Sequence, residues 1–425
     1  MSLSRLGEGY RLAPGARGHG SLRGDGAGAG RSLTARAFGR QSFLRHLDWM
    51  LIAVVLALCV LGTLLVWSAT QPGLADSGAN PRTYLYKEAL WFGIGLVLMV
   101  AVATLDVRRI RAWTPTAYGL AVAGLLAVLS PLGTVVNGAH AWINLPGGFQ
   151  VEPSEFAKLA LVLICALMLS RLGDSGKRPR PREIALAIVC AAPLIGLVVK
   201  EPALGVALVL LAILIGMVVL SGLKLRWLAV LAVLGAAGGA LAFKLHVLRS
   251  YQLQRFTSFT NPNADLAGAG YNAQQAKIAV GSGGLTGHGL FHGSLVAGGY
   301  VPSQSTDFIF TVAGEELGFA GCIAIVVLLG VVVARALRIA ARADDQFGVL
   351  VASGIAVWFA FQAFVNIGMT IGITPITGLP LPFISYGGSA AFADMIAIGV
   401  LQSVHRKRTG LAAAWSRPAA RAERA

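Results

Sequence analysis

The chain has 425 residues, of which 56% are hydrophobic and only 13% are charged, against about 25% charged residues in an average soluble protein. This composition excludes an ordinary soluble enzyme, and apolar runs of about 20 residues recur from residue 49 to residue 404. The net charge of +16 comes largely from basic residues between these runs, so it indicates membrane topology and does not predict nucleic-acid binding.

The amino-terminal segment, residues 1–47, holds eight arginines and no lysine, with a stretch rich in Gly, Ala and Ser. Such a composition cannot bury enough apolar surface to fold. We therefore expect 1–47 to be a disordered basic cytoplasmic tail, 48–404 to be one membrane domain, and 405–425 to be a second basic cytoplasmic tail.

Ten apolar segments follow, which predicts an all-α polytopic membrane protein with about ten transmembrane helices. Of the 35 Lys and Arg residues, 27 fall on the side of the amino terminus and 7 on the other side, so both termini are expected in the cytoplasm. The long extracytoplasmic loop, 247–306, lies between predicted helices seven and eight and exceeds what a passive connector needs. The predicted spans are 49–69, 86–104, 113–132, 154–170, 184–199, 203–221, 227–246, 307–333, 347–372 and 387–404.

The ionisable residues Glu152, Glu155 and Lys158 lie around the start of the fourth predicted span. Pro153 suits the first turn of a helix, with Glu152 as its cap. Glu155 and Lys158 stand three residues apart, so they face one side of that helix and can pair. A structural ion pair is one interpretation. A functional role is the other, because an ionisable group inside a span costs about 2.5–3.5 kcal/mol on insertion scales.

The extracytoplasmic loop contains a glycine-rich run, 278–289. Glycines let backbone N–H groups approach an anion closely, although a flexible loop is the simpler interpretation. His288 and His292 lie four residues apart without a third ligand in the sequence, so no metal site is predicted. The candidate anion-binding residues are Ser282, Gly283 and Gly284.

Asp307 stands where the eighth predicted span begins. Thr306 or Asp307 as a helix cap is one interpretation. The other is that Asp307 is a general base at the membrane surface, where partial desolvation raises the pKa of a carboxylate toward neutrality. Glu315 lies about 80° around the helix and about 12 Å deeper, so it is expected to line the same cavity, whereas Glu316 points elsewhere.

The stretch 366–389 mixes prolines, glycines and hydroxyl residues, which break the last two predicted helices at their outer ends. Irregular backbone at membrane depth survives only where protein or a water-filled cavity satisfies it. This stretch therefore predicts a cavity wall, with Ser385 as a candidate site residue.

Together these segments resemble the SEDS family, the shape, elongation, division and sporulation proteins, over about residues 48–404. Gly270-Tyr-Asn, Val301-Pro and Asn366-Ile-Gly-Met are more similar to the rod-shape (RodA) branch than to the division (FtsW) branch. The matching stretches are Pro153-Ser-Glu-Phe-Ala-Lys158, Ala279-Val-Gly-Ser-Gly-Gly284, Thr306-Asp-Phe-Ile-Phe310 with Glu315-Glu-Leu-Gly318, and Leu381-Pro-Phe-Ile-Ser-Tyr-Gly-Gly388.

The resemblance implies a peptidoglycan glycosyltransferase that polymerises lipid II at the outer face of the bacterial cytoplasmic membrane, with undecaprenyl pyrophosphate as the leaving group. It implies that Asp307 activates the acceptor hydroxyl. No cofactor is predicted, and the sequence leaves open whether a divalent cation, Mg²⁺ or Mn²⁺, assists the pyrophosphate. The residues expected to bind substrate or pyrophosphate are Lys158, Arg255, Lys277, Glu155, Ser282, Gly283, Gly284, Glu315 and Ser385.

The sequence departs from the family at 200–205, where Ala203 replaces the aspartate of the usual Gln-Pro-Asp-Leu-Gly pattern. Glu201 is the candidate to compensate, and Glu152 stands where the family often has Gln.

Two other functions stay open at this point. The first is a flippase or transporter of the lipid-linked precursor, although transporters more often place ionisable pairs at the midplane and show repeats. The second is a non-enzymatic scaffold for cell-wall synthases. The resemblance also implies partners: a class B penicillin-binding protein, which is a transpeptidase, and other proteins of the elongation or division complex.

Overall fold

The computed structural model describes residues 46–136, 139–145, 149–170, 180–201, 203–222 and 268–415, together with single positions between 223 and 267. The chain divides at residue 45 into two units, and everything described here belongs to the second, His46–Ala425. Predictions for the tail 1–47 and for the span 227–246 fall largely outside the described residues.

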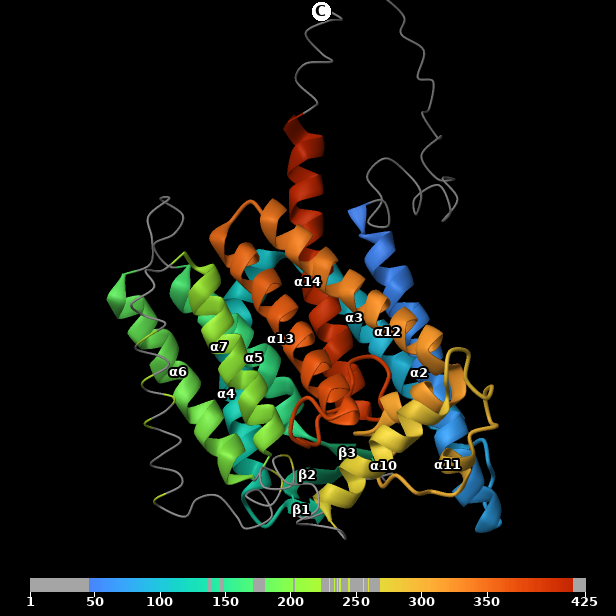
Figure 1. Cartoon of the computed structure of the whole chain (residues 1–425). Coiled ribbons are helices and arrows are strands. Elements are labelled where there is room, and N and C mark those ends of the chain that lie inside the picture. Colours follow the sequence, from blue (N-terminus) through green and yellow to red (C-terminus); the bar gives the residue numbers. More distant parts are fainter. Residues whose placement is uncertain are drawn as a thin grey trace, which may run out of the picture. The chain divides into compact units, whose positions relative to one another are not determined.

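Long helices make up most of the described chain (Figure 1). A helix occupies each predicted apolar segment that the described ranges cover. The helices are α2 (Trp49–Asp76), α3 (Thr83–Thr104), α4 (Val107–Val128), α5 (Pro153–Leu169), α6 (Pro181–Lys200), α7 (Leu204–Leu220), α10 (Ala269–Ser282), α11 (Ser294–Ala297), α12 (Ile309–Arg342), α13 (Gln346–Ile371) and α14 (Gly388–Trp415).

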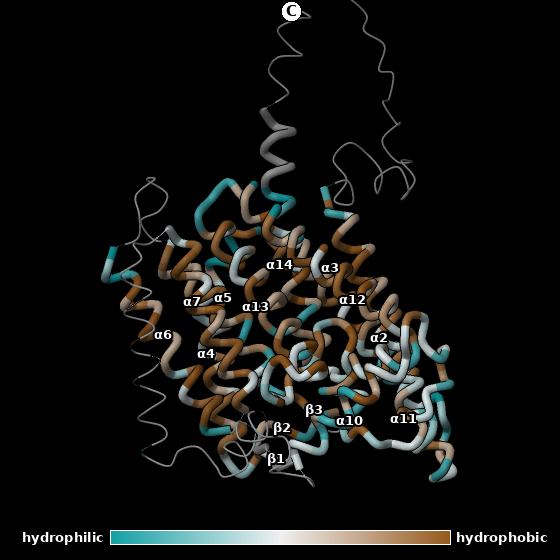
Figure 2. The backbone as a smooth tube through the Cα atoms, in the orientation of Figure 1, coloured by the Kyte–Doolittle hydropathy of each residue, from teal (hydrophilic) through white to brown (hydrophobic). Residues whose placement is uncertain are grey.

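Five of the described helices are long and apolar enough to cross a membrane: α2, α3, α6, α12 and α13. Figure 2 shows hydrophobic residues along these helices and hydrophilic residues gathered near their ends. Several large apolar side chains face outward, among them Val97, Leu120 and Val189. An exposed apolar surface of this kind is expected where lipid, not water, surrounds the helices.

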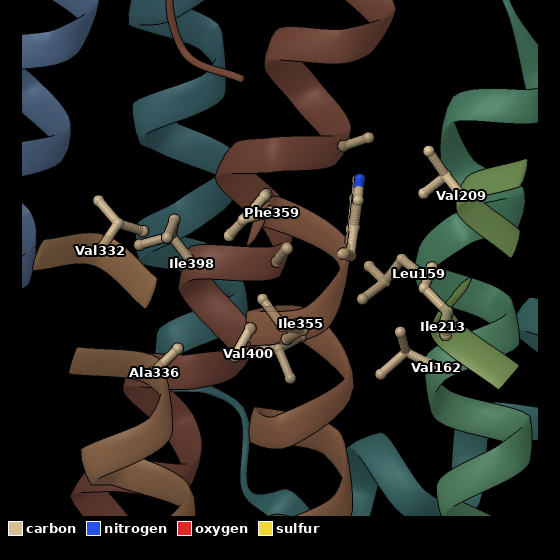
Figure 3. Packing of buried hydrophobic residues seen from close by; sticks show 14 of the residues in the cluster. Leu159, Val162, Val209, Ile213, Val332, Ala336, Ile355, Phe359, Ile398 and Val400 are labelled. Atoms are coloured by element: carbon tan, nitrogen blue, oxygen red, sulfur yellow. The ribbon is translucent and has the colours of Figure 1, made fainter. Parts of the chain in front are cut away.

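The helix α13 lies at the centre of the hydrophobic core (Figure 3). Its residues Ile355 and Phe359 lie among side chains of α5 and α7 on one side and of α12 and α14 on the other. Trp358 on the same helix is fully buried. Because α13 is enclosed in this way, polar groups along it have to find partners inside the protein.

A small antiparallel sheet, absent from the predicted all-α fold, lies between α4 and α5. Its strands are β1 (Gly133–Val136), β2 (Ala139–Leu145) and β3 (Phe149–Val151), in the order β1-β2-β3. The residues Thr134, Val135, Trp142 and Ile143 favour strands because β-branched and aromatic side chains pack well on a pleated surface. The sheet, α10 and α11 lie together at the lower end of the helices in Figure 1, which we call the sheet end.

The glycine-rich run, 278–289, overlaps the end of α10 and supplies hydrogen-bond partners at a break in α12. Gly318 has φ 67° and ψ −165°, which interrupts the helical hydrogen bonds. The freed carbonyls of Glu315 and Glu316 accept the N–H groups of His288 and Gly289, at 3.1 and 2.9 Å. The N–H groups of Phe319 and Ala320 donate to the carbonyls of residues 284 and 285. The run therefore supplies the partners that helical backbone groups need at membrane depth.

Side chains are excluded where this run meets α12. A Cβ atom at Gly283 would lie 2.0 Å from the Gly314 carbonyl oxygen, and one at Gly287 would lie 2.1 Å from the Glu316 carbonyl oxygen. Close backbone packing thus explains these two glycines. Two N–H groups of the run, those of His288 and Gly289, are donated to α12. Anion binding by residues 282–284 stays a prediction.

Gly62 of α2 packs directly against the backbone of the α13–α14 connection, residues 372–387. A Cβ atom at Gly62 would lie 2.6 Å from Ile384 Cα and 2.9 Å from the Phe383 carbonyl oxygen. We expect Gly62→Val to destabilise the protein by about 3 kcal/mol, the upper end for overpacking, because backbone atoms cannot move aside as side chains do. Thermal unfolding of the detergent-solubilised protein measures this.

The matched control is Gly93→Val on α3, where a Cβ atom would meet nothing within 4 Å. We expect it to change stability by less than about 0.5 kcal/mol. Equal melting temperatures for the two variants would contradict the packing described here.

Candidate active site

Asp307 occupies the last turn before α12, at the sheet end. Phe308 takes the N-cap position and no side chain caps the helix, so the helix-cap interpretation of Asp307 is wrong. The backbone of Asp307 is instead held by Asn366 of α13. The Nδ2 of this buried amide donates to the carbonyl oxygens of Asp307, at 2.8 Å, and of Leu379, at 2.6 Å.

Two further hydrogen bonds tie the residues just before Asp307 to the α13–α14 connection. Ser385 Oγ donates to the Thr306 carbonyl oxygen at 2.6 Å, and the Tyr386 N–H donates to the Ser305 carbonyl oxygen at 2.9 Å. Three consecutive carbonyls, at 305, 306 and 307, thus have partners in α13 or in this connection. These contacts therefore hold Asp307 in place through its backbone.

The connection has its own internal support. Phe383 adopts a left-handed conformation, with φ 64°, which costs free energy for a bulky residue. Its N–H donates to Asp394 Oδ2 of α14 at 3.2 Å, and its ring packs edge-on against Phe359. The Leu381 N–H donates to Ser385 Oγ. The hydroxyl of Ser385 is therefore used within the protein.

The side chain of Asp307 meets Arg255 at Gly378. A Cβ atom built on Gly378 would lie 3.3 Å from Asp307 Oδ2 and 3.6 Å from Arg255 Nη1. Gly378 has φ 69°, a conformation that favours glycine. The missing side chain leaves room between a carboxylate, which can accept a proton, and a guanidinium, which can bind an anion.

Burial raises the pKa of Asp307 from its usual value to about 6, while the charge of Arg255 and a hydrogen bond from Thr306 lower it. The carboxylate is thus mostly deprotonated at neutral pH, with a pKa close enough to neutrality to accept and release a proton.

Lys158 and Glu155 form a buried ion pair on α5, with Nζ 2.7 Å from Glu155 Oε2. Lys158 Nζ also donates to Gln362 Oε1 at 2.8 Å and lies 5.0 Å from the centroid of the Trp358 ring. Gln362 Nε2 in turn donates to the carbonyl oxygen of Pro380. The expected pair is present, but Lys158 is fully buried, and its ammonium links α5 to Gln362 of α13, which in turn contacts the α13–α14 connection.

Two further carboxyl groups, those of Glu152 and Glu201, extend this set of buried charged residues. Glu152 interacts electrostatically with Glu155, Lys158 and Asp307, and Glu201 interacts with Glu152. Burial, followed by the proximity of Glu152, raises the pKa of Glu201 to about 8.

Glu201 is fully buried, and neither of its carboxylate oxygens has a hydrogen-bond partner among the described residues. Ala203 two residues later is the N-cap residue of α7. The structure therefore places a carboxyl group beside the position where the family aspartate is missing.

The remaining predicted residues are not all brought to Asp307. Glu315 is fully buried and accepts the N–H groups of Leu295, at 2.8 Å, and Val296, at 3.0 Å, so it anchors α11. Lys277 on α10 is exposed and its side chain runs along Gly372. Ser282 is exposed too, and its hydroxyl donates to the carbonyl oxygen of residue 279. Substrate binding by Lys277, Ser282, Gly283 and Gly284 stays a prediction.

Sequence reasoning assigned no role to Asn366, Gln362 or Gly378. The sequence held one signal for Asn366 and Gln362: each is an amide side chain inside an apolar helix, and a polar group at membrane depth rarely lacks a partner. Nothing in the sequence tells which carbonyl groups such an amide holds.

The chain is similar to known proteins over most of its length. The family model of the cell cycle proteins FtsW, RodA and SpoVE matches residues 48–410. A relative from Trichlorobacter lovleyi, probable peptidoglycan glycosyltransferase FtsW, is 36% identical over 364 residues, which is 85% of this chain and 93% of the relative. The peptidoglycan glycosyltransferase MrdB of Escherichia coli K12 is 36% identical over 363 residues, covering 85% of this chain and 94% of MrdB.

A similar solved structure is described by the words "Structural coordination of polymerization and crosslinking by a peptidoglycan synthase complex". The similarity has a TM-score of 0.68 at 30% sequence identity and covers 85% of this chain and 98% of the matched chain.

Proposed function

Because this chain belongs to the FtsW, RodA and SpoVE family of cell cycle proteins, we propose that it joins lipid II units into glycan strands with Asp307 as the base. The chain is a polytopic membrane protein and a peptidoglycan glycosyltransferase, like its relatives. The substrate, the roles of individual residues and the orientation in the membrane are the proposed parts.

In the proposed reaction Asp307 Oδ2 takes the proton of the 4-hydroxyl of a glucosamine residue. The hydroxyl oxygen then attacks the anomeric carbon of a muramyl residue, the bond from that carbon to the pyrophosphate oxygen breaks, and the lipid pyrophosphate leaves with the electron pair. The proton on Asp307 is released to solvent afterwards. A base within hydrogen-bond reach of the hydroxyl makes such a step about 10²–10⁴-fold faster.

Arg255 is the cation best placed for the leaving group. Its Nη1 reaches the same space beside Gly378 as the carboxylate of Asp307, and a guanidinium matches phosphate oxygens in a bidentate geometry. Lys158, by contrast, is committed to Glu155 and Gln362 inside the protein. We assign Lys158 to positioning the α13–α14 connection and Arg255 to the pyrophosphate.

We place the sheet end at the outer face of the cytoplasmic membrane, with residues 48–404 as the catalytic domain and both termini in the cytoplasm. Support comes from the unequal distribution of basic residues along the sequence. The polyprenyl tail would lie along the outward-facing apolar side chains of the helices.

The proposed partner is a class B penicillin-binding protein that crosslinks the strands, within an elongation or division complex. Support comes from the similar solved structure, a peptidoglycan synthase complex in which polymerisation is coordinated with crosslinking. Relatives named FtsW and MrdB are equally identical to this chain, at 36%. The assignment to the rod-shape branch accordingly stays a prediction from the sequence.

The observation that carries the proposal is the position of Asp307: its backbone is fixed by Asn366 and its carboxylate lies beside Arg255 with a pKa near neutrality. We expect Asp307→Asn to lower the rate of lipid II polymerisation by at least about 10²-fold, because the amide cannot accept the proton. Polymerisation by the purified protein, alone and with its cognate penicillin-binding protein, measures this.

Asp344→Asn is the control, since Asp344 is exposed just beyond the carboxyl end of α12. It should leave the rate unchanged. Polymer formed equally by the wild type and by folded Asp307→Asn would remove Asp307 from catalysis, and no polymer from the folded wild type under either condition would favour a scaffold or a transporter.

The pH dependence of the rate is a second prediction. Asp307 acts as a base only when deprotonated, so kcat/KM should fall as the pH drops through about 6. The charge of Arg255 lowers this pKa, so Arg255→Gln should move the acidic limb to higher pH. A pH–rate profile of both proteins between about pH 5 and 8 shows the shift.

Arg338→Gln serves as the charge-matched control, because Arg338 is exposed near the carboxyl end of α12. Its profile should coincide with that of the wild type. An acidic limb unmoved by Arg255→Gln would mean that a group other than Asp307 controls it.

A further inference from the structure

A cavity lies next to the segment 304–305, which precedes Asp307 in the chain. It has a volume of about 380 Å³ and is formed by the end of α2, the start of α3, α11 and residues 304–305. This volume falls within the range of about 300–1,000 Å³ that is common for small-molecule sites. The residues that offer polar or aromatic groups are Thr70, Asp76, Tyr84, Gln304 and Ser305.

The walls of this cavity are fixed to one another by buried polar contacts. Gln304 Nε2 donates to the carbonyl oxygens of Ala69, at 2.9 Å, and Val296, at 3.1 Å, which links the segment 304–305 to α2 and α11. Glu315 of α12 accepts two N–H groups of α11. These contacts fix the end of α2 to α11 and to residues 304–305, so the walls of the cavity are preorganised.

The aromatic wall is also fixed. The ring of Tyr84 contacts the ring of Tyr386 edge-on, with centroids 4.9 Å apart, and Tyr386 contacts Trp91 at 4.8 Å. Lys87 Nζ lies 5.6 Å from the centroid of the Tyr84 ring. A half-buried tyrosine held in this way offers apolar surface to a ligand at a small cost in conformational entropy.

The chemistry of the lining indicates the class of ligand. Asp76 is the one charged residue among the described residues that line the cavity. A pyrophosphate would be repelled by this carboxylate, and a polyprenyl chain would leave Gln304 Oε1, which has no hydrogen-bond partner among the described residues, unpaired. Hydroxyl groups, a carboxylate and an aromatic ring together suit a neutral ligand rich in hydroxyl and amide groups, which is the chemistry of an N-acetylated sugar.

The position of the cavity relative to Asp307 indicates which sugar residue of a glycan strand would bind there. Ser305 lines it, and Asp307 follows two residues later, so their Cα atoms are at most about 7 Å apart. That separation is of the order of the length of a sugar unit. The separation is therefore short enough for the unit next to the reacting one to enter the cavity.

We propose that this cavity binds one N-acetylated sugar residue of the glycan strand, next to the unit that reacts at Asp307. The inference rests on the proposed polymerase function for the identity of the strand, and on the cavity itself for the chemistry of recognition. A second point of attachment keeps the strand on the enzyme between additions, so the cavity sets the length of the strands.

Direct binding tests the site independently of catalysis. The probe is a soluble oligosaccharide of four N-acetylglucosamine units, which carries neither peptide nor lipid, and its binding to the purified full-length protein is measured by ligand-observed NMR. We expect binding by the wild type, about five-fold weaker binding by Tyr84→Ala and about ten-fold weaker binding by Asp76→Asn. Asp76 is exposed, so its substitution leaves the fold intact.

Tyr86→Ala is the matched control, because Tyr86 is on the same helix, is 59% exposed and does not line the cavity. It should bind the probe as the wild type does. No binding by the wild type, or equal binding by all four proteins, would overturn the proposal. Binding confined to a peptide-bearing glycan would also overturn it, in favour of a peptide site.

Strand length is the functional readout. At equal consumption of lipid II, Tyr84→Ala and Asp76→Asn should give shorter strands than the wild type and Tyr86→Ala. Unchanged strand lengths would contradict the role of the cavity in retaining the strand. A wild type that binds the probe but makes no polymer would instead refute the polymerase function and leave the sugar site standing.

Discussion

The architecture depends on one constraint: irregular backbone at membrane depth must find its hydrogen-bond partners inside the protein. Asn366 meets this constraint at the centre of the site, because its single amide nitrogen serves the carbonyls of Asp307 and Leu379. Gln362, one turn away on α13, does the same for Pro380 and receives the ammonium of Lys158. The amide side chains of α13 therefore connect the ion pair of α5 to the segment that carries Asp307.

The same constraint accounts for the glycine-rich run. At Gly318 the helix α12 loses its internal hydrogen bonds, and residues 284–289 replace them. The break turns the first part of α12 into a separate short helix that carries Glu315, and Glu315 anchors α11. The segment of α12 before the interruption thus anchors α11, which lines the cavity next to residues 304–305.

Much of this could be predicted from the sequence. The helices follow from long apolar runs, and the Glu155–Lys158 pair follows from a spacing of three residues. The residues alone left Asp307 open between a helix cap and a base; its catalytic role came from the resemblance to the SEDS family and stays a proposal. The sheet was missed although Asn137-Gly138 is a hairpin signal flanked by strand-forming residues. The partners of Asn366 and Glu315 could not be predicted, because those contacts depend on how kinked helices pack, which no local pattern encodes.

The central claim is that Asn366 acts on the reaction by fixing the backbone of Asp307. The most direct test is the steady-state kinetics of lipid II polymerisation by Asn366→Ala, with thermal unfolding measured alongside. The account predicts a kcat at least about ten-fold lower with KM little changed, because a small misplacement of a catalytic group slows the chemical step more than it weakens binding. A folded variant with unchanged kcat would contradict the claim that this amide positions Asp307.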